Sequence, residues 1–323
     1  MKILFGKIIL YSILLFIALE LIVRVFHLYS EYPTFIINDK NVKTYAPNQD
    51  GYYTTGNRRM NFAQYHINKT GFNSYREFTP SENETDIAII GDSFIEGLHQ
   101  NYNNSIGKKL EHKLNDSVNV FEYGHSGYDF ADQLHLISAY KEKFQLIDKT
   151  IIYLKFENDL KRDFYEPDQY WVDSQYFLTR RIAKKIKLIN YAENIGLFEP
   201  LRDLKRNAVA FIKQEKTTPS TNLEDTQKKS KDLDNVYLNN FKKLITEFGF
   251  DKDKTVLLLD SRATSDAFLN FCKNQNIKYI DFAAYFENSS TPTTLIYDMH
   301  WNNHGRELIA NAIADYIKKE QQN

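Results

Sequence analysis

Short apolar runs recur along the chain and alternate with segments of helical spacing. Residues 86–90 form an apolar, β-branched run that ends at Gly91, and similar runs occupy 118–121, 150–154, 255–259 and 277–280. Short apolar runs bounded by turn residues are typical of strands that are buried on both faces. Each of these five runs therefore predicts a strand of a parallel sheet.

Segments with apolar residues three or four positions apart lie between the runs. They predict helices over residues 105–114, 133–144, 233–248, 267–274 and 305–319. In the last of these, Leu308, Ile309, Ala312, Ile313, Tyr316 and Ile317 form one apolar stripe. Strands that alternate with such helices indicate a parallel sheet covered by helices on both faces.

Two segments interrupt this alternation. Residues 28–85 are polar and rich in turn residues, which predicts an N-terminal extension of short strands and loops. Residues 166–252 predict an insertion that is helical and basic over 180–213 and a flexible polar loop over 214–233. A solvated helix face is the simpler interpretation of the basic run at 180–187, and contact with an anionic lipid or polymer is the alternative.

The N-terminus is mostly apolar from Ile3 to Phe26, and Ile8–Leu19 carries no charge. As a helix this stretch is about 36 Å long, enough to cross a hydrocarbon core of about 30 Å. Residues 1–27 are therefore predicted to be a transmembrane anchor. A cleavable signal peptide is the alternative, but the sequence after the apolar run, from Phe26 to Glu31, has no pair of small residues for cleavage. Lys2 and Lys7 lie ahead of the uncharged stretch Ile8–Leu19, and Arg24 lies near its other end. The positive-inside rule therefore predicts a single-pass protein whose remaining chain is extracytoplasmic.

Composition narrows the function classes. Apolar residues make up 42% of the chain, enough for a sizeable core, so residues 86–323 are expected to form one domain with the insertion. Forty-one basic and 42 acidic residues give a net charge of −1, which argues against a nucleic-acid partner. The single cysteine, Cys272, cannot form an internal disulfide, and its apolar surroundings predict a buried side chain.

Gly91-Asp92-Ser93 follows the first predicted strand and precedes a helical segment. Ser93 would therefore lie at the carboxyl end of a sheet strand, where open α/β folds bind ligands. The N-terminus of a helix also offers unpaired N–H groups to a developing oxyanion. The tripeptide alone is common in turns, so this position alone does not identify a nucleophile.

Asp298-Met299-His300 lies just before the last predicted helix. An acid can hold an imidazole in the tautomer that accepts a serine proton, so Asp298 and His300 are candidates for the acid and base of a triad. The alternative is that Asn302 or Asn303 caps the helix and His300 is an ordinary loop residue.

Together these segments resemble the SGNH (GDSL-like) serine hydrolase family in its membrane-anchored form. Gly91-Asp92-Ser93 is similar to the first block of the family. Ser126-Gly127-Tyr128 is similar to the second, Asn158-Asp159 to the third, and Asp298-x-His300-Trp-Asn-x-x-Gly305 to the last. The blocks occur in the family's order over about residues 85–165 and 253–323. The run from His66 to Phe72 is also similar to the lead-in of anchored members.

The resemblance implies a three-layer α/β sandwich with a flavodoxin-like parallel sheet. It implies Ser93 as nucleophile, His300 as base and Asp298 as its orienting acid. The N–H groups of Ser93 and Gly127 and the amide of Asn158 would form the oxyanion hole, with no cofactor required. The chain departs from the family at three places: at Glu122, at Phe156, and in an acid two rather than three residues before the histidine. The first two are expected to alter the walls of the site.

Three functions are consistent with these residues. The first is an esterase that deacylates a cell-envelope or exported glycan, the second an O-acyltransferase, and the third a non-catalytic glycan-binding or assembly protein. His300 and His304, with Asp298 nearby, have the His-x-x-x-His spacing that binds zinc when both histidines lie on one face of a helix. Here His300 precedes the predicted helix and no further ligand is evident, so no metal is predicted. His125 is expected to be a packed or exposed loop residue rather than part of the site.

Overall fold

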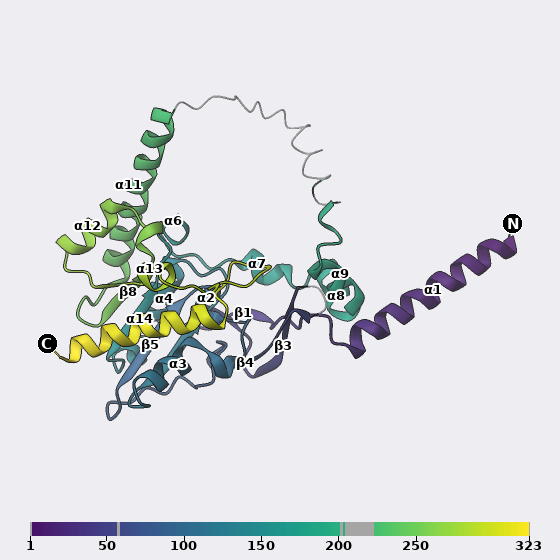
Figure 1. Cartoon of the computed structure of the whole chain (residues 1–323), viewed down its shortest axis with the longest axis horizontal. Helices are drawn as coiled ribbons and strands as arrows, with labels where there is room; N and C mark the ends of the chain where they lie inside the picture. Colours follow the sequence, from purple (N-terminus) through teal and green to yellow (C-terminus); the bar gives the residue numbers. More distant parts are fainter. Residues whose placement is uncertain (1, 57–58, 201–202, 204–222, 323) are drawn as a thin grey trace. The chain divides into compact units, whose positions relative to one another are not determined.

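The computed structural model describes residues 2–56, 59–200, 203 and 223–322. Its contacts divide the chain into two units (Figure 1). Unit 1 consists of Met1–Tyr32, Tyr52–Ala63 and Tyr170–Ser220, and unit 2 of Pro33–Gly51, Gln64–Gln169 and Thr221–Asn323. Each unit is described separately.

A five-stranded parallel sheet forms the centre of unit 2. Its strands are β5 (Asp86–Gly91), β6 (Asn119–Gly124), β7 (Lys149–Tyr153), β8 (Thr255–Leu259) and β9 (Tyr279–Asp281). Their spatial order is β6-β5-β7-β8-β9, with every neighbouring pair parallel. This is the flavodoxin-like order. The second strand lies on one side of the first, and the later strands are added in sequence on its other side. The predicted fold class is confirmed.

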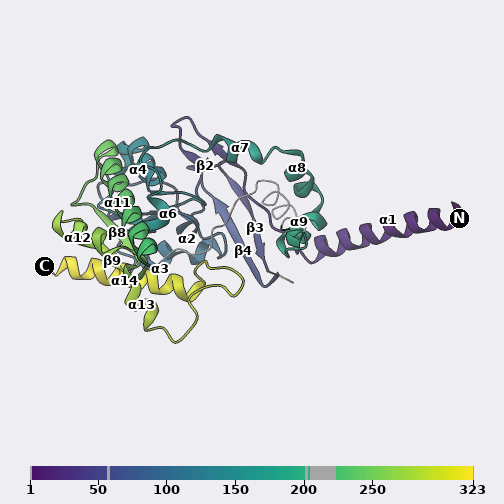
Figure 2. The same cartoon turned by 90° about the horizontal axis from the view of Figure 1, so that it is seen from above.

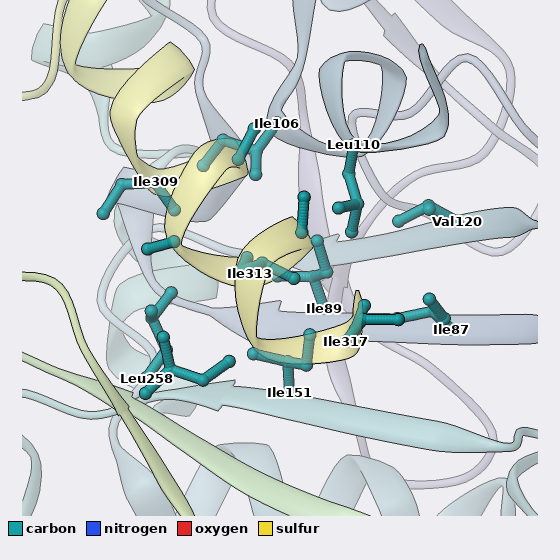
Figure 3. Close-up of a cluster of buried hydrophobic side chains, with 14 of the residues drawn as sticks. Ile87, Ile89, Ile106, Leu110, Val120, Ile151, Leu258, Ile309, Ile313 and Ile317 are labelled. Carbon is teal, nitrogen blue, oxygen red and sulfur yellow. The ribbon is translucent and has the colours of Figure 1, made fainter. Parts of the chain in front are cut away.

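One face of the sheet is covered by α3 (Ile106–Lys113) and α14 (Asn303–Gln321). Ile87 and Ile89 of β5 point to this face, and Ile313 and Ile317 of α14 lie beside them (Figure 3). Their side chains are fully buried or nearly so. The stripe predicted over residues 308–317 is thus the face with which α14 contacts the sheet.

The opposite face is covered by α4 (Phe130–Ala139), α11 (Leu223–Phe248) and α12 (Asp266–Asn274) (Figure 2). Ile152 of β7 and Leu257 of β8 point to this face, because successive side chains of a strand alternate between faces. Phe241 and Phe268 pack edge to face with their ring centroids 4.9 Å apart, and Cys272 of the same cluster is fully buried. The prediction of a buried cysteine is confirmed.

The remaining elements are short. The N-terminal extension contains two antiparallel pairs, β1 (Phe35–Ile37) with β2 (Lys43–Tyr45) and β3 (Gln49–Thr55) with β4 (Asn61–Ile67). Unit 2 also contains α2 (Ser93–Glu96), η2 (Tyr102–Asn104), α5 (Lys141–Phe144), α6 (Phe156–Asp159), η3 (Ser261–Ala263) and α13 (Ala283–Glu287). Unit 1 contains α1 (Lys2–Val25), α7 (beginning at the boundary residue Gln169 and ending at Ser174), α8 (Leu178–Lys185) and α9 (Lys187–Asn194).

Three predicted boundaries were wrong. The helix expected over 133–144 is two helices that meet at Tyr140, whose φ of −113° is not helical. The basic helix expected over 180–213 is broken at Ile186, where extended backbone separates α8 from α9. The polar segment expected to be a loop over 214–233 is helical from Leu223 onward, and 204–222 lie outside the described residues. In the first two cases the local backbone conformation overrode a weak helical pattern.

The predicted apolar N-terminal segment forms the single helix α1. Its mean hydropathy of 2.5 and its length are sufficient to cross a membrane, and almost none of it is buried within the protein. These properties fit both an anchor and a signal sequence. Retention of the segment and its orientation remain predictions.

A glycine at the end of β6 brings the sheet very close to α2. A Cβ at Gly124 would lie 1.9 Å from the backbone N of Glu96 and 2.5 Å from the backbone C of Ile95. Both neighbours are backbone atoms, so a side chain at this position must displace either the strand or the helix.

We therefore expect Gly124→Ala to lower the free energy of unfolding by at least about 2 kcal/mol, measured by urea denaturation of the detergent-solubilised chain. Gly249→Ala is the control, because a Cβ there meets nothing within 4 Å and only its left-handed φ of +80° is strained. That variant should lose about 1 kcal/mol. Equal losses in the two variants would show that the approach of α2 to β6 is not tight.

Candidate active site

Ser93 is the first residue of α2, directly beyond the carboxyl end of β5. Asp92 caps this short helix by accepting the Phe94 N–H at 2.9 Å. Gly97 ends it with a left-handed φ of +63° and donates its N–H to the Ser93 carbonyl. A strand that ends at one glycine and a helix that ends at another hold the Ser93 side chain at the edge of the sheet.

Ser93, His300 and Asp298 form a continuous hydrogen-bonded chain. The Ser93 Oγ lies 2.7 Å from the His300 Nε2, and the His300 Nδ1 contacts the Asp298 Oδ1. The same carboxylate oxygen accepts the His300 backbone N–H at 2.7 Å. When the Nδ1–H donates to Asp298, the Nε2 is free to accept the proton of Ser93. The geometry is that of a nucleophile, a base and an orienting acid.

The backbone around His300 is fixed on both sides. The Leu295 N–H donates to the His300 carbonyl at 3.0 Å, and the Asn302 N–H donates to the Thr293 carbonyl at 3.0 Å. Asn302 also caps α14 by accepting the Gly305 N–H. A Cβ at Gly305 would lie 2.2 Å from the Thr293 oxygen, which explains why glycine is required there. The same loop therefore caps α14 and places His300 beside Asp298, so the two interpretations of this segment are compatible.

A second histidine, His99, contacts the same carboxylate. Its Nε2 lies 3.2 Å from the Asp298 Oδ2, and its ring stacks on that of His300 at 4.3 Å. Phe94 contacts the His300 ring at 4.6 Å. The sequence did not point to His99, because it lies in no recognisable motif and almost two hundred residues before Asp298. Only the tertiary fold brings the three groups together.

The electrostatics of this cluster favour an ionised acid and a neutral base. Burial favours a protonated carboxyl, yet hydrogen bonds from His99 and from the N–H and ring of His300 hold the pKa of Asp298 below its usual range. Burial lowers the pKa of His300, and the neighbouring His99 adds to this, outweighing the opposite effect of Asp298. At neutral pH His300 is therefore ready to accept a proton.

Ser93, Gly127 and Asn158 line one cavity of about 370 Å³ at this edge of the sheet. Gly127 has a left-handed φ of +76°, and Asn158 lies on α6 after β7. The Lys161 Nζ donates to the Asn158 Oδ1 at 3.4 Å, so the amide nitrogen is the group that Asn158 can offer to a ligand. The three expected oxyanion donors are thus brought together around one cavity, and their catalytic role stays a prediction.

Glu96 connects α2 to the loop that contains Gly127. It is buried, and its Oε1 accepts the Ser126 N–H at 2.8 Å and the hydroxyl proton of Tyr45. Burial raises the pKa of Glu96 to about 7, against the effect of these two hydrogen bonds. The carboxyl group therefore fixes the position of Gly127 relative to Ser93.

Neither Glu122 nor Phe156 lines the cavity, so the expectation that they alter its walls was wrong. Glu122 is buried in β6, and its carboxyl group lies so close to Gly107 that a Cβ there would be only 2.9 Å away. Burial raises the pKa of Glu122, and nearby Arg306 opposes this rise. Phe156 is buried against Phe268 at 5.1 Å. Alternation along β6 and the first turn of α6 point these side chains into the core.

Arg306 also supports the nucleophile helix. Its guanidinium is almost fully buried and donates from Nη1 to the Phe94 carbonyl at 2.8 Å. A Cβ at Gly97 would lie 2.5 Å from this guanidinium. Arg306 therefore provides a hydrogen-bond donor to a carbonyl of α2, a helix too short to satisfy all of its carbonyls internally.

The other histidines have different surroundings. His125 is buried between the rings of Tyr45 and Tyr128, at 4.6 and 5.0 Å, as expected for a packed residue. His304 is half-buried, and its Nε2 lies 2.8 Å from the Ser289 Oγ. It is not part of the Ser93 cluster.

The residue that lies close enough to join Asp298 and His300 in a metal site is His99, not His304. Donor atoms of His99, Asp298 and His300 lie within 4.8 Å of one another. However, both nitrogens of His300 and both oxygens of Asp298 already take part in the contacts described above. A metal ion would have to displace the hydrogen bond between His300 and Asp298, so the present geometry fits proton transfer better than metal coordination.

Comparisons with known proteins give fold likeness only. No protein-family model and no curated protein matches the chain. Among solved structures, a lipase/acylhydrolase from Enterococcus faecalis is similar, with 14% identity, a TM-score of 0.41, and coverage of 73% of this chain and 96% of that one. The psychrotrophic esterase EstA from Pseudoalteromonas sp. has 14% identity and a TM-score of 0.42, with coverage of 74% and 100%. A carbohydrate acetylesterase family member from Sinorhizobium meliloti has 9% identity and a TM-score of 0.35, with coverage of 73% and 98%.

His99 should affect the pH dependence of any reaction that uses His300 as a base. Only neutral His300 accepts a proton, so kcat/KM on a short ester should fall as pH drops through the His300 pKa, which lies below 6.5. His99→Phe keeps a ring against His300 but removes the electrostatic effect of His99 on His300 and its contact with Asp298. The acidic limb should then move to higher pH, and the plateau should fall about tenfold.

His99→Gln keeps a hydrogen-bond donor and is the matched control, with a smaller loss expected on the plateau. An unchanged acidic limb in both variants, together with a lower melting temperature, would indicate that His99 only packs against its neighbours.

Proposed function

We propose that the chain is a serine ester hydrolase that works through a covalent acyl-enzyme. The observation that supports this most is the chain of contacts from Ser93 through His300 to Asp298, since a packed core would not need these three groups in series. Their position beside a cavity at the carboxyl edge of the sheet adds to it.

In the first half of the reaction, the Ser93 Oγ attacks the ester carbonyl carbon while its proton moves to the His300 Nε2. The carbonyl oxygen becomes an oxyanion, stabilised by the N–H groups of Ser93 and Gly127 and by the Asn158 amide. One such donor typically contributes about 2.7–4 kcal/mol in the transition state. The tetrahedral intermediate collapses, the C–O bond to the alcohol breaks, and protonated His300 gives the proton to the leaving oxygen.

In the second half, water replaces the alcohol. His300 takes a proton from this water, its oxygen attacks the acyl carbon, and the bond to the Ser93 Oγ breaks. The proton then returns to Ser93 and the carboxylic acid departs. Asp298 stays ionised throughout and stabilises the imidazolium.

The substrate we propose is a hydrophilic acyl ester, such as an acylated glycan of the cell envelope or an exported polysaccharide. Support comes from the charged and amide side chains around the cavity, among them Lys155, Asn158 and Arg162, which suit a sugar better than a lipid tail. A sugar hydroxyl in place of water would make the same residues an O-acyltransferase. Hydrolysis of acetylated glycans with and without added sugar acceptor separates the two reactions. The extracytoplasmic location of this unit also remains a prediction from the charges around α1.

A fluorophosphonate probe should label the wild-type chain, because the probe reacts with serines that have an adjacent base. Ser93→Ala should abolish both the labelling and the hydrolysis of a short ester. Ser289→Ala is the matched control, since Ser289 also contacts a histidine but lies outside the cluster. Equal labelling of Ser93→Ala and wild type would exclude Ser93 as nucleophile, and labelling of neither would favour a non-catalytic binding protein.

His300→Ala should reduce kcat/KM by a factor of about 10²–10⁴ or more, because it removes the base. His304→Ala should retain most activity, since it removes only the contact with Ser289. Asp298→Asn should fall between them, because an amide leaves the base in place but favours the wrong tautomer. All three are compared on a short ester after circular dichroism confirms folding. An inactive His304→Ala beside an active His300→Ala would contradict the assignment.

A further inference from the structure

The last turns of α1 are hydrogen-bonded to the junction of α8 and α9 in unit 1 (Figures 1 and 2). The Glu20 carboxylate accepts the N–H groups of Lys187 at 3.0 Å and Leu188 at 2.7 Å, the first donors of α9. Arg24 donates to the Lys185 carbonyl, the last of α8, at 2.7 Å. A carboxylate at a helix N-terminus and a cation at a helix C-terminus satisfy backbone groups that those ends leave open. The two helices are therefore fixed to the end of the apolar helix.

α8 is amphipathic, and none of its residues is buried. Leu178 and Ile182, one turn apart, are 70% and 38% exposed. The other side of the helix carries four cations, Arg180, Arg181, Lys184 and Lys185. The sequence has no acidic residue between positions 174 and 192, so no carboxylate nearby in the sequence neutralises this charge.

Aromatic residues and another cation gather at the same end of α1. His27 stacks on Tyr29 at 4.3 Å, and Tyr52 stacks on Phe62 at 4.7 Å. The Arg59 guanidinium lies 3.8 Å above the Phe62 ring. Aromatic rings with cations beside them are typical of the headgroup level of a membrane, where amphipathic side chains are favoured.

We propose that α8 is an interfacial helix that binds anionic phospholipids of the membrane crossed by α1. Leu178 and Ile182 would enter the boundary between headgroups and acyl chains, and the four cations would contact lipid phosphates. A solvated helix face explains the charges but leaves the exposed apolar stripe unexplained. An interfacial helix accounts for both, as well as for the attachment to α1.

The test uses the full chain in nanodiscs of phosphatidylcholine, alone or mixed with phosphatidylglycerol. Leu178→Cys is labelled with bimane, and quenching by lipids with brominated acyl chains is measured. Cys272 is fully buried and its thiol pKa is raised by burial to about 12, so the wild type serves as the labelling control. Quenching should be at least about twofold greater with the anionic lipid and should weaken at high salt.

Glutamine at Arg180, Arg181, Lys184 and Lys185 together should abolish the difference between the two lipids. The matched control places glutamine at four exposed lysines of unit 2, Lys141, Lys242, Lys273 and Lys318, and should keep the difference. Circular dichroism confirms folding of each variant. Equal quenching in both lipids, or equal loss in both quadruple variants, overturns the proposal.

Discussion

The candidate site depends on the close approach of a four-residue helix to the end of a strand. α2 is too short to be stable alone, and its backbone lies where any side chain at Gly124 would have to be. Arg306 then supports its carbonyls from α14, and Glu96 joins it to the Gly127 loop. Both are buried polar groups that would be costly without these hydrogen bonds. The position of Ser93 therefore results from contacts with three different parts of the chain.

The arrangement of Asp298 explains how an acid only two residues away can orient the histidine. Its Oδ1 accepts both the backbone N–H and the ring of His300, so the chain turns back on itself within the motif. This leaves Oδ2 for His99. If more residues separated the acid from the histidine, the carboxylate could reach the ring from a more distant part of the loop. Here the backbone turn between Asp298 and His300 determines how the carboxylate meets the ring.

Much of the fold could be predicted from the sequence because the strands are buried on both faces and so appear as unbroken apolar runs. Ser93 and His300 could also be predicted from the sequence, since each lies at the boundary of a helix or strand with turn residues around it. His99 was not, because a contact between distant segments leaves no local pattern. The walls of the cavity were misjudged for a related reason: sequence position placed Glu122 and Phe156 near the motifs, but the alternation of faces directs both into the core. The break at Ile186 also leaves no local pattern, since the first N–H groups of α9 are satisfied by Glu20 of another helix.

Cys272 has a consequence for how the protein matures. It is the sole cysteine of the sequence. It lies on α12 in one buried cluster with residues of α11, and burial raises its thiol pKa to about 12. A thiol in this state is a poor nucleophile and is shielded from oxidants and metal ions. Acquisition of the native state therefore requires neither an oxidase nor a disulfide isomerase, and the fold is indifferent to the redox potential of the compartment in which it forms.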